Sequence, residues 1–210
     1  FNQALPGELL MRFTKTLLAL ATVAGLGLSG VANAESNIDV GAGAGARSAS
    51  ARVDFRIVIP DFLFVRVGTA GANNVDLVDF DLAAIANPET SLGTGTAIAA
   101  TTNGTLDVDV ISNSGQVTIT ENTNGALTNG SGGTISYSEI LTASSNPALP
   151  APVLSDATNN TSAPTLNASQ VTVRSAQWTY TYANNNLPDA GTYGGVNVQN
   201  GRVTYVAATP

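Results

Sequence analysis

Histidine and cysteine are absent from this chain, and its one lysine is Lys15. Zinc, haem, iron–sulfur and copper sites normally take imidazole or thiolate ligands, so these cofactors are close to excluded. Ser-His-Asp, Cys-His and Ser-Lys catalytic systems are also excluded, because the chain after Lys15 contains no His, Cys or Lys to act as base or nucleophile. A glycosidase-type pair of carboxylates stays open in principle, but no spacing singles out a pair. The sequence therefore predicts a protein that is not an enzyme and binds no cofactor.

Positive charge is also scarce. After residue 34 the chain has six arginines against fourteen aspartates and glutamates, which gives a net charge of −8. Nucleic acids and anionic membranes are bound by basic patches, so neither is an expected partner. The chain is instead rich in Thr, Asn, Ser, Gly and Ala, which suit strands and the turns between them. This composition is typical of secreted or surface β proteins of bacteria.

Long apolar runs are confined to one N-terminal stretch. Arg12 and Lys15 precede an uncharged apolar run of about 12 residues, too short for a bilayer core that needs about 20. Ala32-Asn33-Ala34 then completes a signal-peptidase cleavage pattern. These features predict a helical, cleavable signal peptide and no stable membrane span after cleavage. The protein is expected in the periplasm, outside the cell or on the cell surface.

Four segments follow from this pattern. The first is an upstream, non-native extension, the second the signal peptide, the third a low-complexity Gly/Ala stretch, and the fourth a β-sandwich domain. Their predicted bounds are 1–10, 11–34, 35–52 and 53–210.

The Gly/Ala stretch has two interpretations. Low complexity indicates a flexible linker. Its residues also alternate with a period of two, which suits a strand donated to an open sheet edge of its own domain or of a neighbouring subunit. In that hypothesis the apolar face of the donor consists of Ile38, Val40, Ala42, Ala44 and Ala46.

Alternating apolar and polar residues predict strands along the rest of the chain. They cover 53–59, 62–67, 75–82, a hairpin within 105–122, 134–140, 171–182 and 201–207. No helix is predicted after the signal peptide. Strands of this number, joined by short turns, predict an all-β, Ig-like antiparallel β-sandwich. Its predicted core aromatics are Phe55, Phe62, Phe64, Phe80, Trp178, Tyr180 and Tyr205.

Three further features leave alternatives open. Asp76, Asp79 and Asp81 are spaced so as to suggest calcium, although acids on a strand usually form its solvated face. Residues 142–170, with four prolines, are either a surface loop with a binding role or a mobile insert. The row of aromatic residues Trp178, Tyr180 and Tyr182 would either bind sugar or pack in the core of the sandwich.

Two stretches carry a family resemblance. Residues 190–195 (AGTYGG) followed by 202–207 (RVTYVA) resemble the end of secreted bacterial β-sandwich proteins, among them spore coat protein U-like and pilin-like subunits. Residues 52–68 (RVDFRIVIPDFLFVRVG) are similar to the first strands of uncharacterised exported proteobacterial proteins. The chain departs from pilin-like subunits in lacking a disulfide and in ending on Thr209-Pro210. The resemblance implies a surface-associated β fold.

Composition and resemblance together predict an exported structural or adhesive surface protein. It could be a fibre subunit that joins copies of itself or sibling subunits by β-strand addition. The alternative is a secreted module that binds carbohydrate or another surface, with a glycan as partner.

Overall fold

A computed structural model describes residues 36–71, 73–156 and 159–210. The predicted extension 1–10 and signal peptide 11–34 lie outside these residues. The chain divides into two units, Phe1–Val58 and Ile59–Pro210. This division lies six residues after residue 53, where the sequence places the start of the β-sandwich domain. Among the described residues, no helix is long and apolar enough to cross a membrane.

The described part of the first unit, residues 36–58, is exposed and forms no helix or strand. It bends at residues 42–44. The bend is closed by Asp39, which accepts a hydrogen bond from the Ser48 amide (3.1 Å) and forms an ion pair with Arg47 (3.8 Å). Arg47 also donates to the carbonyl of Gly43. The Gly/Ala stretch is thus folded back on itself, whereas residues 53–58 have neither turn nor bend.

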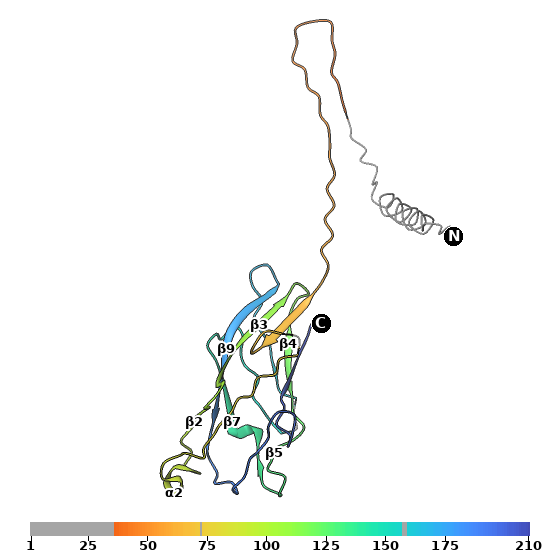
Figure 1. Ribbon diagram of the computed structural model, residues 1–210. Coiled ribbons are helices and arrows are strands. Elements are labelled where there is room, and N and C mark those ends of the chain that lie inside the picture. Colours follow the sequence, from red (N-terminus) through yellow and green to blue (C-terminus); the bar gives the residue numbers. More distant parts are fainter. Residues whose placement is uncertain (1–35, 72, 157–158) are drawn as a thin grey trace, which may run out of the picture. The chain divides into compact units, whose positions relative to one another are not determined.

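The second unit contains one larger antiparallel sheet (Figure 1). Its main path runs β1-β3-β9-β2, and β7 pairs with β9 as well. The two longest strands, β3 and β9, lie at its centre. They pair along eight consecutive positions, from Thr105↔Thr179 to Ser112↔Thr172. The strands are β1 (Leu63–Val67), β2 (Ile98–Ala99), β3 (Thr105–Ser112), β7 (Ile140–Ser144) and β9 (Thr172–Tyr182).

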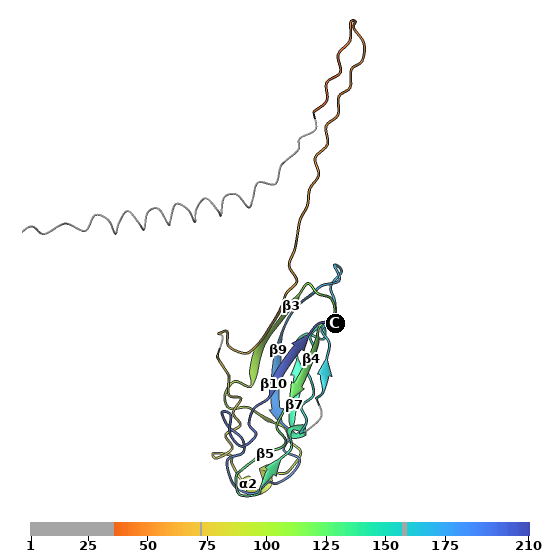
Figure 2. The same cartoon turned by 90° about the vertical axis from the view of Figure 1, so that its right-hand side faces the viewer.

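A smaller antiparallel sheet, ordered β10-β4-β8, forms the other layer; Figure 2 shows β10 beside β4. A short hairpin and two helical turns lie in the connections. The strands are β4 (Thr118–Asn122), β8 (Thr161–Ser162), β10 (Thr204–Ala208) and the hairpin pair β5 (Leu127–Thr128) and β6 (Thr134–Ile135); the turns are α2 (Pro88–Ser91) and a 3-10 turn, Tyr137–Glu139. The all-β antiparallel sandwich is confirmed, and α2 is the one four-residue α-helix that the described part adds.

The predicted hairpin within 105–122 is wrong in its pairing. Both strands form, as β3 and β4, but β3 pairs with β1 and β9 whereas β4 pairs with β10 and β8. The turn at residues 113–115 therefore carries the chain from one sheet to the other. Alternation sets the inward face of each strand, but it does not choose between a partner in the same sheet and a crossing to the opposite one.

The core lies between the two sheets. Val108 and Val110 of β3, Ile119 of β4 and Trp178 of β9 are fully buried, and Tyr180 is nearly so. The Trp178 indole donates its N–H to the carbonyl of Leu149 at 3.1 Å, so the one polar atom of this side chain is satisfied. The predicted placement of Trp178 and Tyr180 in the core is correct.

Other predicted core aromatics are not enclosed. Phe55 is 88% exposed in the first unit, and the predicted strand 53–59 is not formed. Phe62 and Phe64 are 50% and 46% exposed. Phe64 alternates with the half-buried Val65 of β1, which packs on the core, so its ring lies on the outer face of the sheet. Phe80 and Tyr205 are half-buried against the core.

The predicted strand 75–82 is reduced to one bridge between Asp79 and Thr102. Val75 and Leu77 stay exposed.

Residues 142–170 are neither a surface excursion nor a mobile insert where they are described. They contain the end of β7 and all of β8, and four of their apolar residues are buried. Backbone groups find side-chain partners: Gln116 donates to the Pro164 carbonyl (2.6 Å), and Arg174 donates to the carbonyls of Thr165 and Leu166 (both 2.8 Å). Extended chain thus fills one wall of the core with Leu149, Pro152, Leu154 and Pro164.

Candidate assembly surface

The last strand, β10, has one unpaired edge. It pairs with β4 in the register Tyr205↔Glu121 and Ala207↔Ile119, and within the described residues no strand lies on its other side. Its five residues, TYVAA, include no charge and no proline. Natural edge strands are usually protected from further pairing by lysine, proline or an inward charge. The edge of β10 has none of these.

β1 is the edge strand of the other sheet, and it contacts β10. Within the described part of the chain β1 pairs with β3 alone, and Arg66 donates from Nε to Asp109 of β3 at 2.9 Å. A hydrogen bond from Ser175 (2.6 Å) and the Arg66 guanidinium lower the pKa of Asp109, against an opposing effect of burial. The outer face of β1 is thus held by a charged pair that β10 lacks.

Inward side chains are covered unequally across the sandwich. Those of β3, β4 and β9 reach full burial, as at Val110, Ile119 and Trp178. The inward side chains of β1 and the β10 region are only half-buried, although they pack on the same core. We call the line between these two edges the seam; its residues are Val65, Val67, Val203, Tyr205 and Ala207.

A tyrosine cluster connects the seam to the core. The Tyr205 and Tyr180 hydroxyls are 3.1 Å apart, and the Tyr205 ring meets Trp178 edge-on with centroids 5.3 Å apart. Burial raises the pKa of Tyr205 well above its usual value and raises that of Tyr180. Burial also raises the pKa of Tyr137 to about 12, with further contributions from Asp156 and Glu121. These hydroxyls stay protonated at neutral pH and act as hydrogen-bond donors and acceptors.

Glu121 is fully buried beside this cluster. Its Oε1 accepts a hydrogen bond from Ser155 (2.8 Å), whereas Oε2 has no hydrogen-bond partner among the described residues. The predicted acidic group at Asp76, Asp79 and Asp81 does not converge on one point, since Asp76 accepts from the Thr69 amide (2.5 Å) and Asp81 from the Ala83 amide (2.9 Å). In the described ranges no group of three or more acidic side chains could hold a metal ion.

Residues 53–59 (VDFRIVI) form the most apolar exposed segment of the described chain. Val53, Phe55, Ile57 and Ile59 alternate with Asp54 and Arg56, and all of the apolar side chains are exposed. In soluble proteins exposed apolar patches of this kind mark interaction sites. We name this segment the apolar strip.

The chain just after the apolar strip is anchored to the domain by Asn113. The Asn113 amide donates to the carbonyl of Pro60 (2.8 Å), and its oxygen accepts from the Phe62 amide (2.9 Å). One side chain thereby imitates the two hydrogen bonds that a neighbouring strand would make. Residues 60–62 are thus held in line with β1.

The five residues predicted as a strand donor, Ile38, Val40, Ala42, Ala44 and Ala46, are all exposed and lie in no strand. The bend at 42–44 divides them into two groups. Sequence reasoning placed Phe55 of the apolar strip in the core and so missed that the whole strip is exposed. Pro60 was the available signal, because a residue without an N–H marks the place where a ladder ends.

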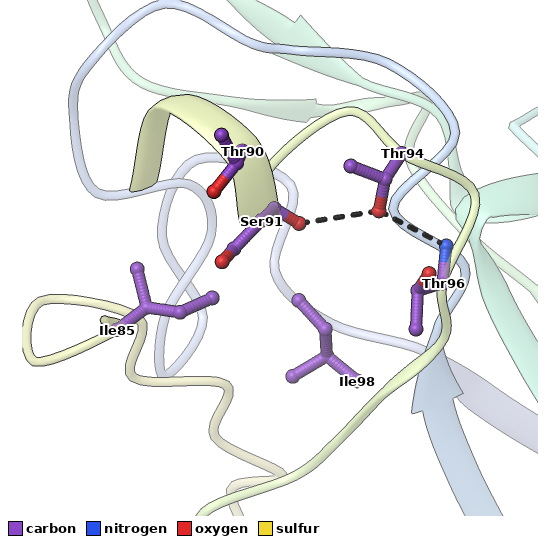
Figure 3. Close-up of a pocket in the computed structure, with 6 residues that line it drawn as sticks. All are labelled: Ile85, Thr90, Ser91, Thr94, Thr96 and Ile98. Carbon is purple, nitrogen blue, oxygen red and sulfur yellow. Dashed lines mark hydrogen bonds between the residues drawn. The ribbon is translucent and has the colours of Figure 1, made fainter. Parts of the chain in front are cut away.

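Two hollows in the described part of the domain are lined mainly by hydroxyl-bearing, amide and aliphatic residues. The depression of about 350 Å³ in Figure 3 is lined by Ile85, Ile98 and hydroxyl-bearing residues, among them Thr94, whose hydroxyl donates to the Ser91 carbonyl and accepts from the Thr96 amide (both 3.3 Å). A second, of about 420 Å³, lies beside Arg66 and Asp107, which bond to neighbouring side chains. Neither is lined by an aromatic ring.

No protein-family model matches the chain. Searches of curated proteins and of solved structures also find no match. The resemblance to spore coat protein U-like and pilin-like subunits therefore remains a prediction from the sequence alone.

Proposed function

We propose that the protein is an exported structural or adhesive surface protein whose copies join by β-strand addition. Export rests on the predicted signal peptide, residues 11–34. The observation that carries assembly is the presence of two complementary surfaces in the described chain. One is the exposed, alternating apolar strip, and the other is the unpaired, uncharged edge of β10. In strand addition, main-chain hydrogen bonds supply affinity and alternate side chains fill pockets.

Two further observations support assembly over sugar binding. Trp178 and Tyr180, which a sugar-binding platform would present at the surface, lie in the core, where a sugar cannot stack on them. The two hollows have no aromatic lining. The carbohydrate-binding alternative therefore receives no support from the geometry.

The test is self-association of the chain from residue 35 onward. Sedimentation velocity over a range of concentrations, with negative-stain electron microscopy, should show concentration-dependent polymers. A chain that starts at residue 60 should stay monomeric at the same concentrations, because it lacks the whole exposed segment. Circular dichroism of both chains checks that the shortened one retains its β structure. If the chain that starts at residue 35 is monomeric at every concentration, the proposal is wrong.

A further inference from the structure

We propose that the apolar strip of one copy adds as a strand to the edge of β10 in a second copy and covers the seam. This inference rests on the proposed function and names its two contact surfaces. It replaces the predicted donor, residues 38–46, with residues 53–59.

The donor fits in length and pattern. Seven extended residues span roughly 23 Å, and the five residues of β10 span about 17 Å. Val53, Phe55, Ile57 and Ile59 recur every second residue, as do the inward positions of β10, so one set can pack on the other. Pairing would remove from water the apolar side chains of the strip and those of the seam, because each set would cover the other.

The acceptor fits because the seam is the incompletely covered side of the core. Tyr205 and Ala207 of β10 face inward and remain half-buried, as do Val65 and Val67 of β1. A strand paired with β10 would direct every second side chain onto these residues. Its other face would join the outward Val206, which is 48% exposed.

β10 is the acceptor rather than β1 for two reasons. β1 has a charged side chain, Arg66, which is paired with Asp109 of β3, and such charges protect an edge strand from further pairing. β10 has no proline and no charge among its five residues. An added strand can therefore form uninterrupted hydrogen bonds with β10.

The donor is assigned to a second copy because Asn113 fixes the direction of the chain at residues 60–62, where it enters β1. To pair within its own domain, the strip would have to reverse direction across residues 60–62. Asn113 holds the Pro60 carbonyl and the Phe62 amide in line with β1, which opposes that reversal. Transfer to a neighbour needs no such turn.

The absence of native cysteine makes the test direct. Val206→Cys is placed on the outward face of β10, and the donor variants Asp54→Cys, Arg56→Cys and Val58→Cys on the outward face of the strip. Each donor variant is mixed with the acceptor variant in denaturant, refolded and oxidised. Because directly opposed positions on neighbouring strands bring Cβ atoms within reach of a disulfide, one donor should give a cross-linked dimer.

Ala44→Cys is the matched control donor, and Phe64→Cys on β1 is the matched control acceptor. We expect no cross-link between Ala44→Cys and Val206→Cys, and none between the strip variants and Phe64→Cys. A link from position 44 to position 206 would return the donor role to residues 38–46. A link from the strip to position 64 alone would move the acceptor to β1. Either result overturns the inference.

Failure of the inference can be told apart from failure of the proposed function. If the cysteine-free chain forms polymers but no donor cross-links to position 206, assembly stands and the inference falls. If the cysteine-free chain forms no polymers, the proposed function itself falls. A chain with both Arg56→Cys and Val206→Cys that closes its disulfide only as a monomer would show insertion within one copy and overturn the inference as well.

Discussion

Two segments of this protein have almost the same pattern and opposite environments. Residues 53–59 (VDFRIVI) and residues 106–111 (LDVDVI) both alternate apolar with charged or polar side chains. In the second, Val108 and Val110 are fully buried in β3. In the first, Phe55 is 88% exposed and no strand forms.

Neighbouring strands account for the difference. β3 has a ladder on each side, to β1 and to β9, so its backbone is satisfied and its apolar face is covered. The apolar strip has no ladder among the described residues. Alternation therefore defines which face of a segment will be buried, and a partner strand decides whether burial happens.

The largest loss of stability is expected from removal of a ring that is buried in the folded domain, in contrast to the exposed ring of the apolar strip. Trp178→Ala in β9 deletes a fully buried side chain that also donates to the Leu149 carbonyl. Such a change costs about 3–5 kcal/mol, which is a large part of the stability of a domain this size. Urea denaturation followed by circular dichroism should show the loss as a lower midpoint or as an unfolded chain.

Trp178→Phe provides the matched control for that experiment. It retains a ring in the core and loses the indole N–H, so it should lower stability by less than the alanine variant. Equal losses from the two variants would mean that ring packing contributes little at this position.

The sequence allowed some elements to be predicted because they carry their own pattern. Residues 171–182 alternate over a long stretch, and β9 forms there with Trp178 and Tyr180 inside. The pairing of β3 with β4 was predicted wrongly, because a turn such as 113–115 is compatible with a hairpin and with a crossing between sheets. That choice is made by the whole set of strands.

Residues 142–170 were misjudged for a different reason. Prolines and small polar residues are typical of loops, yet Pro152 and Pro164 are buried. A proline can line a core where its missing N–H would have no partner, and its carbonyl can be satisfied by a distant side chain such as Gln116. Nothing local in the sequence indicates that such a side chain will be present.

A smaller loss of stability is expected at high pH. Burial raises the pKa of Tyr137 to about 12 in the folded protein, whereas an unfolded tyrosine titrates near 10. The folded state therefore retains its proton where the unfolded state has lost it. Stability is fully present below about pH 10 and declines as the pH rises toward 12, by an amount on the order of 2 kcal/mol for this residue.

The measurement is urea denaturation at several pH values between about 8 and 12, with tyrosinate absorbance recorded in parallel. Tyr137→Phe should flatten the decline, at the cost of the hydrogen bond to the Asn200 carbonyl (2.7 Å) at all pH values. A wild-type chain whose stability is constant across this window would contradict the assignment of Tyr137 as a buried phenol. The apolar strip has no tyrosine, so this pH effect belongs to the folded domain alone.

The smallest effect on stability is expected from Phe55→Ala in the apolar strip. The ring is almost entirely exposed, and substitutions at such positions usually change the free energy of unfolding by less than about 0.5 kcal/mol. Urea denaturation at low protein concentration should therefore give the wild-type midpoint. The same variant should assemble poorly, because its alanine leaves the seam of the neighbouring copy uncovered.

Arg56→Ala is the control that separates one face of the strip from the other. Residues 55 and 56 are neighbours in an exposed segment, but in a strand their side chains point to opposite sides. If the strip acts as an added strand, the change at position 55 should reduce polymer mass in sedimentation much more than the change at position 56. Equal reductions would mean that the strip associates as an unstructured apolar segment, and its resemblance to β3 would then end at the sequence.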